Sequence, residues 1–456
     1  MTKILFTFDT EDFIDPLSDD TLLGLCQVFS KHGLRACFCL VTERAKVLRD
    51  RRRWDVLNVL KDHEVDSHTA FHSVHPTIAE YTEPLDWRDG VKENLLREGE
   101  ALDLLKEICH IDRIWSAIKP GNSWAPQGIY AYRLLGIPTF GDGPLSLPKG
   151  RPVYYCGSIV MQYQISMEEP VLEDRVDDLL AEIRKYEKND LLLLYAHPTM
   201  LSHSQFWDAV NFAHGQNQPW GDWIMPKRRS TQEWEQAERG MDKFLGKIKS
   251  EGYPFTTYEE IVKAAPPTPA EIDGSLTERL AEATAGRIDE YRVAEGYLSP
   301  AEVFGVLNWA MAHDVPETEK RVPVRFLLGP IDPPPKSKWA SSIGASIRVE
   351  SLRKAAQSLE PQLRYHVPAW IQVDDVTLPP MAYLDLVARS LVDGRTSGTI
   401  TVRELPTYPA TFERYGVNDI DFKGTWSIIF PEGFDAPNLV RQAHAQSWSI
   451  KQVPVC

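Results

Sequence analysis

The chain has 456 residues, of which 43% are hydrophobic and 25% charged, a composition typical of a soluble globular protein with more than one core. The formal net charge of −15 argues against a general nucleic-acid-binding protein, because phosphate contacts need clustered Lys and Arg side chains. No apolar run approaches the roughly 18 residues that a membrane span needs. Since the N-terminus leads straight into a predicted strand, we expect a cytoplasmic protein without membrane contact.

Short apolar runs alternate with amphipathic segments along the first 260 or so residues. In chain order, the predicted strands are 4–6, 36–41, 64–67, 114–118, 137–140, 190–195 and 255–257. The predicted helices are 21–32, 54–60, 90–108, 125–135, 171–186 and 230–252. Strands and helices that alternate at these lengths indicate a parallel α/β sheet or barrel.

Reactive side chains follow several of these predicted strands. The first strand ends in a run of carboxylates from Asp9 to Asp12, and His68, Asp142 and His197 each follow a later strand. Because the carboxyl ends of parallel strands meet at one face of a barrel or sheet, we expect these side chains to lie close together.

Four of the twelve histidines fall between residues 63 and 76. His68 and His72 are four residues apart, and on a helical turn that spacing puts both imidazoles on one side. Two neutral imidazoles that converge in this way suit a divalent transition metal, which needs a third ligand from elsewhere in the chain.

The regular alternation ends at a Pro-rich linker, residues 263–274. Beyond it, similar helix starts at 298–304 and 378–384 are followed by similar Val-Arg pairs near 324 and 402. We therefore expect residues 275–456 to form a smaller, mainly helical α+β module with two similar units of about 80 residues. Such a repeat fits binding or assembly better than a second active site.

Three motifs together resemble the polysaccharide deacetylases, a carbohydrate esterase group that includes the chitooligosaccharide deacetylases. They are the strand that ends in Asp9 to Asp12, the pattern His68-Thr69-x-x-His72, and His197-Pro198 after a Leu-rich strand. The resemblance covers roughly residues 1–262 and implies a distorted (β/α)7 barrel, in agreement with the alternation.

The resemblance implies a role for each motif residue. His68 and His72 would be metal ligands, Asp9 the catalytic base and His197 the general acid. The first motif of this chain reads Asp-Thr-Glu-Asp in place of two adjacent aspartates. We favour Asp12 as the third metal ligand, with Glu11 as the second choice. Zinc is the expected metal, and cobalt or iron also suits two histidines and one carboxylate.

One motif departs from the family pattern. The family's Arg-x-Pro motif appears here as Ile118-Lys119-Pro120, without the arginine that orients the base. A lysine is a point charge and does not replace a guanidinium fork. Lys119, Asp142 and Trp124 are candidates for substrate contact or for orienting the catalytic groups.

The implied function is metal-dependent hydrolysis of a non-peptide C–N amide bond, with an N-acetyl sugar or polysaccharide as the expected substrate. Two alternatives stay open: an intracellular amidase of a cyclic or small acyl amide on the same barrel, and a non-catalytic glycan-binding protein with a remnant site. The downstream module faintly resembles pseudomurein-binding repeats, at 352–357 and 367–386. The expected partner is a glycan or small molecule, and a homo-oligomer is left open.

Overall fold

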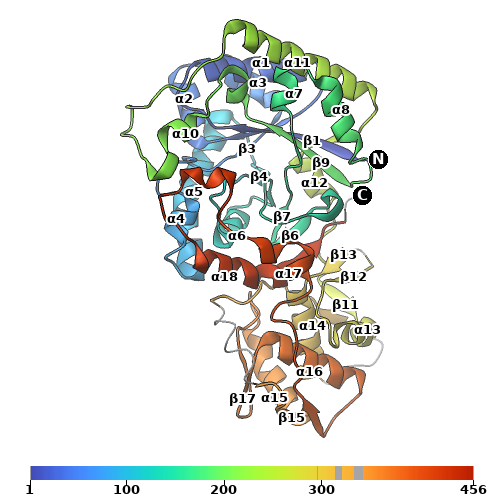
Figure 1. The fold of residues 1–456 in the computed structure, drawn as a ribbon. Helices are drawn as coiled ribbons and strands as arrows, with labels where there is room; N and C mark the ends of the chain where they lie inside the picture. The colour runs from blue at the N-terminus through green and yellow to red at the C-terminus, as the bar shows by residue number, and fades with distance from the viewer. Residues whose placement is uncertain (1, 295, 314–320, 333–341, 455–456) are drawn as a thin grey trace.

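The fold is mixed α/β, with a large upper part built around one sheet and a smaller lower part made of helices and short hairpins (Figure 1). The computed structural model describes residues 2–294, 296–313, 321–332 and 342–454.

A sheet of eleven strands forms the centre of the larger part, in the order β19-β6-β7-β5-β4-β3-β2-β1-β9-β8, with β10 also paired to β1. The strands are β1 (Lys3–Thr10), β2 (Cys37–Leu40), β3 (Glu64–Ser67), β4 (Ser116–Ala117), β5 (Thr139–Phe140), β6 (Val153–Tyr155), β7 (Ser158–Val160), β8 (Ile165–Ser166), β9 (Leu191–Ala196), β10 (Phe255–Thr256) and β19 (Lys451–Gln452). Only β6 pairs antiparallel with its described neighbours, β7 and β19. The predicted parallel α/β sheet is thus confirmed, whereas its closure into a distorted (β/α)7 barrel stays a prediction.

Helices connect the parallel strands and cover the sheet. They are α1 (Leu17–Lys31), α2 (Thr42–Asp50), α3 (Trp54–Val59), α4 (Ile78–Thr82), α5 (Trp87–Cys109), α6 (Pro126–Leu134), α7 (Glu168–Leu172), α8 (Val176–Arg184), α9 (Pro198–Ser202), α10 (Trp207–Asn211), α11 (Thr231–Ser250) and α12 (Tyr258–Ala264). The single helix predicted at 171–186 is wrong, because the chain breaks it into α7 and α8 at Asp174, which has a φ of +55°. Helix α2 and strands β6 to β8 were not predicted.

Strand β1 is buried on both faces, and its alternating side chains enter two different clusters. Phe6 and Phe8 pack edge-on against Phe29 of α1, with ring centroids 5.1 and 5.3 Å apart. Leu5 points to the other face, into a cluster of buried strand residues. Because side chains alternate along a strand, Asp9 lies on the Leu5 side, away from the covering helices.

The lower part contains two units with the same order of elements. The first is β11 (Glu271–Asp273), α13 (Ser275–Thr284), β12 (Tyr291–Val293), β13 (Gly296–Leu298), α14 (Pro300–Ala312) and β14 (Arg321–Pro323). The second is β15 (Ser346–Arg348), α15 (Val349–Leu359), β16 (Ile371–Val373), β17 (Val376–Leu378), α16 (Pro380–Val392) and β18 (Thr399–Thr401). In each unit the first and last strands pair antiparallel around a two-stranded hairpin. Helix α13 packs on α16 and α14 on α15, so each unit covers the other.

The last fifty residues return to the larger part, a feature that the sequence did not indicate. Helices α17 (Thr411–Arg414) and α18 (Pro437–Ala445) lie against it in red in Figure 1, and β19 extends its sheet beside β6. Tyr415, Phe430 and Leu439 are buried in the same cluster as Phe6 and Phe8. This end of the chain therefore completes the core of the first part.

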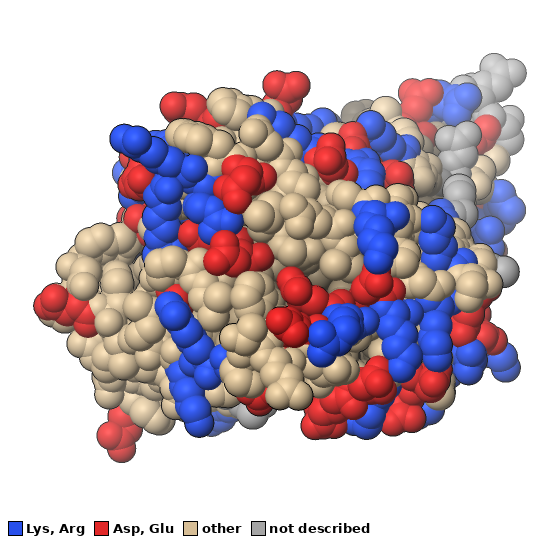
Figure 2. Space-filling model, turned by 90° about the horizontal axis from the view of Figure 1, so that it is seen from above, with Lys and Arg blue, Asp and Glu red and all other residues tan. Residues whose placement is uncertain are grey.

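No helix within the described ranges is both long and apolar enough to cross a membrane. On the face shown in Figure 2, Lys and Arg side chains are intermixed with Asp and Glu. Five of the six cysteines are described, and all five are buried free thiols.

Candidate functional site

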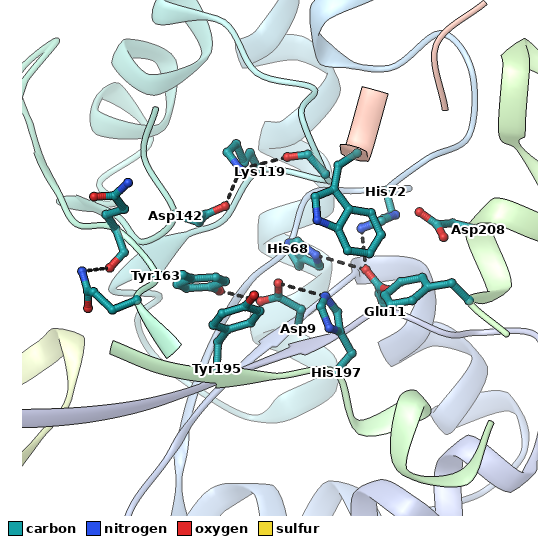
Figure 3. A pocket seen from close by; sticks show the side chains of 15 residues that line it. Asp9, Glu11, His68, His72, Lys119, Asp142, Tyr163, Tyr195, His197 and Asp208 are labelled. Atoms are coloured by element: carbon teal, nitrogen blue, oxygen red, sulfur yellow. Dashed lines mark hydrogen bonds and ion pairs between the residues drawn. The ribbon is translucent and has the colours of Figure 1, made fainter. Parts of the chain in front are cut away.

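The strand ends meet at a cavity of about 260 Å³, and the structure brings seven of the predicted site residues together in its lining (Figure 3). These seven are Asp9, Glu11, His68, His72, Lys119, Asp142 and His197. They lie at or just after the ends of β1, β3, β4, β5 and β9, which belong to the parallel part of the sheet and therefore point their carboxyl ends to one face.

A buried carboxylate and two imidazoles form the floor of this cavity. The Oε2 atom of Glu11 lies 2.5 Å from Nε2 of His72 and 3.3 Å from Nε2 of His68. Burial alone would raise the pKa of Glu11, but the two histidines outweigh it and hold the pKa below its ordinary value. The other oxygen, Oε1, is buried without a hydrogen-bond partner among the described residues. These three side chains could hold a metal ion.

The outer nitrogen of each imidazole is held by a hydrogen bond. Nδ1 of His68 lies 3.3 Å from the carbonyl oxygen of Ile118, and Nδ1 of His72 lies 2.7 Å from Oγ of Ser73. The Ser73 hydroxyl donates in turn to the carboxylate of Asp208, at 3.2 Å. A hydrogen on each Nδ1 can be donated to these partners, so that loss of a proton from Nε2 would give the tautomer that a metal ligand needs.

A loop presents the two histidines, so the expectation of a helical turn is wrong. His68 directly follows β3, and both Thr69 and His72 have a left-handed backbone, with φ of +68° and +56°. Such a conformation costs a residue other than glycine roughly 1–2 kcal/mol. The Thr69 hydroxyl accepts from the backbone N–H of His72 at 3.0 Å, and buried Glu98 accepts from the N–H of Ala70 at 3.1 Å. These contacts hold the loop in its strained form.

Asp12 does not lie with the histidines, which corrects our choice of the third ligand. Its Oδ1 accepts from the backbone N–H groups of Ile14 and Asp15, at 2.9 and 3.2 Å. Its Oδ2 accepts from the hydroxyl of Thr199, at 2.9 Å. Asp12 thus joins the loop after β1 to α9. Glu11, the second choice, occupies the position beside the imidazoles.

Asp9 and His197 lie next to this cluster. Tyr163 donates its hydroxyl to Oδ1 of Asp9 at 2.6 Å, and Nε2 of His197 lies 3.6 Å from Oδ2 of Asp9 (Figure 3). The carboxylate of Glu168 accepts from both Nδ1 and the backbone N–H of His197, at 2.6 and 2.7 Å. Burial would lower the pKa of His197, but the charge of Glu168 outweighs it and raises the pKa to about 10.

The remaining predicted residues have different surroundings. Lys119 pairs with Asp142 and donates to the carbonyl of Gly121 at 3.0 Å, so its ammonium is bound to these two groups. Trp124 does not line the cavity, which corrects its proposed role in substrate contact. It is 2% exposed and stacks on Phe422, with ring centroids 5.3 Å apart, because it belongs to the hydrophobic core.

Several cavity residues were missed by reasoning from the sequence. Among them are Tyr163, Phe206, Asp208 and Trp426. Glu168, which contacts His197 from outside the lining, was missed as well. Tyr163 and Glu168 flank β8, a two-residue strand too short to give a periodic signal. Trp426 lies more than 200 residues beyond Phe206 in the chain, and no local pattern connects the two.

A second group that could hold a metal ion lies deeper in the sheet, formed by Cys37, Glu64 and Asp66. Glu64 accepts from the backbone N–H of Tyr258 at 2.9 Å, and Asp66 from that of Ser116 at 2.8 Å. Burial raises the pKa of the Cys37 thiol well above its ordinary value, which disfavours the thiolate that a metal binds. We read this group as a set of buried side chains that satisfy backbone donors.

No family model matches the chain, and no curated protein does either. Solved structures that match include peptidoglycan deacetylase PdaC from Bacillus subtilis, at 14% identity and a TM-score of 0.31, over 57% of this chain and 92% of that one. Another is the polysaccharide deacetylase Bc1974 from Bacillus cereus, at 13% identity and a TM-score of 0.33, over 59% and 96%.

A third match is BA3943, a CE4 family pseudoenzyme from Bacillus anthracis, at 11% identity and a TM-score of 0.33, over 57% of this chain and 64% of that one. The structural neighbours are therefore CE4 polysaccharide deacetylases and a pseudoenzyme of the same family. The faint resemblance to pseudomurein-binding repeats receives no support from these comparisons.

We predict that Glu98→Gln makes stability less dependent on pH. Burial raises the pKa of Glu98 from 4.5 to about 7, although Tyr132 and the N–H of Ala70 donate to it. The native state therefore binds more protons than the unfolded state between these values, and stability falls as pH rises through them. A glutamine keeps an acceptor oxygen without this charge.

Chemical denaturation at pH 5 and pH 8 measures the effect. The variant should be more stable than the wild type at pH 8, by about 1–3 kcal/mol, with a smaller difference at pH 5. If the variant and the wild type differed in stability by the same amount at pH 5 and at pH 8, the prediction would be contradicted.

Proposed function

We propose that the chain is a metal-dependent hydrolase of a non-peptide C–N amide bond, which removes the acetyl group of an N-acetyl sugar or polysaccharide. The observation that carries this proposal is the cluster of Glu11, His68 and His72, with Asp9 and His197 beside it in one cavity. A metal-binding set adjoining an acid–base pair has the parts that metal-assisted amide hydrolysis needs.

The donor set fits a divalent transition metal. Two imidazole nitrogens and one carboxylate are a common catalytic ligand set, which leaves coordination positions free. Within the described part of the chain, Oε1 of buried Glu11 has no hydrogen-bond partner, which gives the same indication, since a buried carboxylate oxygen normally has one. Zinc is our first choice, and cobalt or iron would also suit these ligands. When bound, such a cation supplies Lewis acidity toward an amide carbonyl and an attacking water.

Asp9 is our candidate for the base. Its carboxylate lines the cavity, and the Tyr163 hydroxyl holds one of its oxygens at 2.6 Å, which fixes the orientation of the other. The Oδ2 atom would accept a proton from water as the water attacks the amide carbon.

His197 is our candidate for the acid. Glu168 holds Nδ1, so Nε2 is left facing the cavity and Asp9. The raised pKa keeps the imidazole protonated at neutral pH, and Nε2 can donate that proton to the leaving amine as the C–N bond breaks. The products are a carboxylic acid and an amine, acetate and an amino sugar for the proposed substrate.

A second candidate is an amidase that acts on a cyclic or small acyl amide with the same groups. It is favoured by the pairing of Lys119 with Asp142, which leaves Asp9 without an orienting cation from that position. A panel that compares N-acetylglucosamine, chitin oligomers and cyclic amides would separate the two activities.

We predict that Glu11→Gln and His68→Ala each weaken metal binding by roughly 100-fold or more, because each removes a ligand atom. Asp12→Asn should keep the metal, since that side chain bonds to backbone N–H groups and Thr199. Metal content after dialysis, with circular dichroism as a control for folding, measures the effect.

Loss of metal in Asp12→Asn together with full occupancy in Glu11→Gln would show that the ligand is Asp12. A wild-type protein that takes up no transition metal would favour the third reading, a glycan-binding protein with a remnant site.

We predict that Asp9→Asn keeps its metal and lowers turnover by about 10²- to 10⁴-fold, the usual contribution of a general base. The asparagine preserves the size of the side chain but cannot accept the proton. Turnover of the best substrate in the panel and metal content are measured on the same sample. An active variant would remove Asp9 as the base.

We predict that Glu168→Gln shifts the alkaline limb of the pH–rate profile to lower pH. The charge of Glu168 raises the pKa of His197, and the acid is lost as pH rises through that pKa. Glu169→Gln is the matched control, because the neighbouring side chain is exposed and pairs with Arg175. If the alkaline limb of the pH–rate profile were unchanged in Glu168→Gln, His197 would not be the acid.

A further inference from the structure

A segment from the far end of the chain lies against the cavity. Residues 421–431, which we call the covering segment, contain a short 3-10 helix, Thr425–Ile429. In Figure 3 this part of the chain, in salmon, enters from above, over the residues of the strand ends. Trp426 is its contribution to the cavity lining.

The covering segment is fixed to the larger part on both sides of Trp426. Before it, Phe422 stacks on Trp124, and the carbonyl of Lys423 accepts from the side chain of Asn122 at 3.1 Å. After it, Ile429 and Phe430 are buried in the main hydrophobic cluster. An indole anchored in this way has a defined position over the cavity, and its backbone lies close to the larger part.

Gly215 makes a close approach of the covering segment feasible, because a Cβ atom there would lie 2.9 Å from Pro431. Gly121, with a φ of +53°, also lies beside the segment, and a Cβ atom there would make an ordinary van der Waals contact, 3.5 Å from the carbonyl oxygen of Trp426. The loop at Gly215 is therefore shaped to accept the covering segment.

The side chain of Trp426 is not buried by these contacts. It is 43% exposed, whereas the Phe430 side chain that anchors the segment is 5% exposed. Its ring lies 5.1 Å from that of Phe206 and 6.1 Å from that of His197. Because Trp426 lines a polar cavity, the open surface of its indole is available to a ligand bound there.

The chemistry of the lining selects the kind of ligand. A pyranose ring has one face of C–H groups, which binds an indole, and a rim of hydroxyls, which binds polar side chains. Trp426 and Phe206 supply the aromatic surface, and Lys119 and Asp142 supply polar groups in the same cavity. The cavity, at about 260 Å³, is smaller than the roughly 300–1,000 Å³ typical of sites for drug-sized ligands.

We infer that Trp426 is a specificity-determining residue that stacks on the sugar ring of the substrate, and that the covering segment limits the site to one ring. The ligand class is a single N-acetylhexosamine unit, with the amide directed at Asp9 and His197. This inference rests on the proposed function and adds to it the residue that selects a sugar.

Binding of N-acetylglucosamine, measured by calorimetry on the full chain in the Asp9→Asn background, tests the inference without turnover. Trp426→Ala should weaken binding by about 3- to 10-fold, the value expected for an aromatic stacking contact, and Trp426→Phe should restore most of it. Trp54→Ala is the matched control, since Trp54 is 50% exposed and lies on α3, away from the cavity. Metal content should be equal in all variants.

A chitin tetramer tests the limit to one ring. Its affinity should lie within a few-fold of the monomer, and an affinity more than 10-fold higher would overturn that limit. Equal sugar affinity in Trp426→Ala and its parent, or no sugar binding in the parent, would overturn the stacking role.

Amide hydrolysis by the wild type is measured in a separate experiment. A protein that hydrolyses amides but binds sugar equally with or without Trp426 refutes this inference alone. A protein that binds sugar through Trp426 but hydrolyses no amide supports it and refutes the catalytic proposal.

Discussion

The geometry of the site depends on one buried carboxylate, that of Glu11. Glu11 is 2% exposed, and an ionised carboxylate at such a position needs cationic or hydrogen-bonding partners. His68 and His72 meet that need only because a strained loop holds them there, and the loop is held by Glu98 and by the Ser73–Asp208 pair. The position of one carboxylate thus depends on residues from β3, α5 and α10, as well as on its own strand.

Much of the parallel sheet and of the site could be predicted, because it depends on local patterns. Apolar runs predicted most strands of the sheet. His68 and His197 were predicted as site residues because they directly follow such runs. The choice between Glu11 and Asp12 could also have been made from the sequence. Side chains alternate along an extended chain, so Glu11 shares the face of Asp9 and Asp12 does not.

The rest could not be predicted, because it depends on contacts between distant segments. Glu168 reaches His197 from a short helix after β8, and Trp426 reaches the cavity from the other end of the chain. Nothing in the local sequence of either residue indicates its partner. Closure of the sheet into a barrel and the division into domains at 262–275 stay predictions. The equal order of elements in the two units of the lower part agrees with the spacing of the sequence repeat.

The return of the C-terminus to the sheet has a consequence for biosynthesis. Strand β19 pairs with β6, and α18 packs its buried face into the cluster that surrounds β1. A chain emerging from the ribosome can form the first strands and helices early, but this core lacks part of its apolar surface until residues 411–452 are made. The sheet edge at β6 stays open during the same interval, since its partner is β19. Completion of the larger part therefore requires closure of the long loop between β6 and β19, which costs conformational entropy.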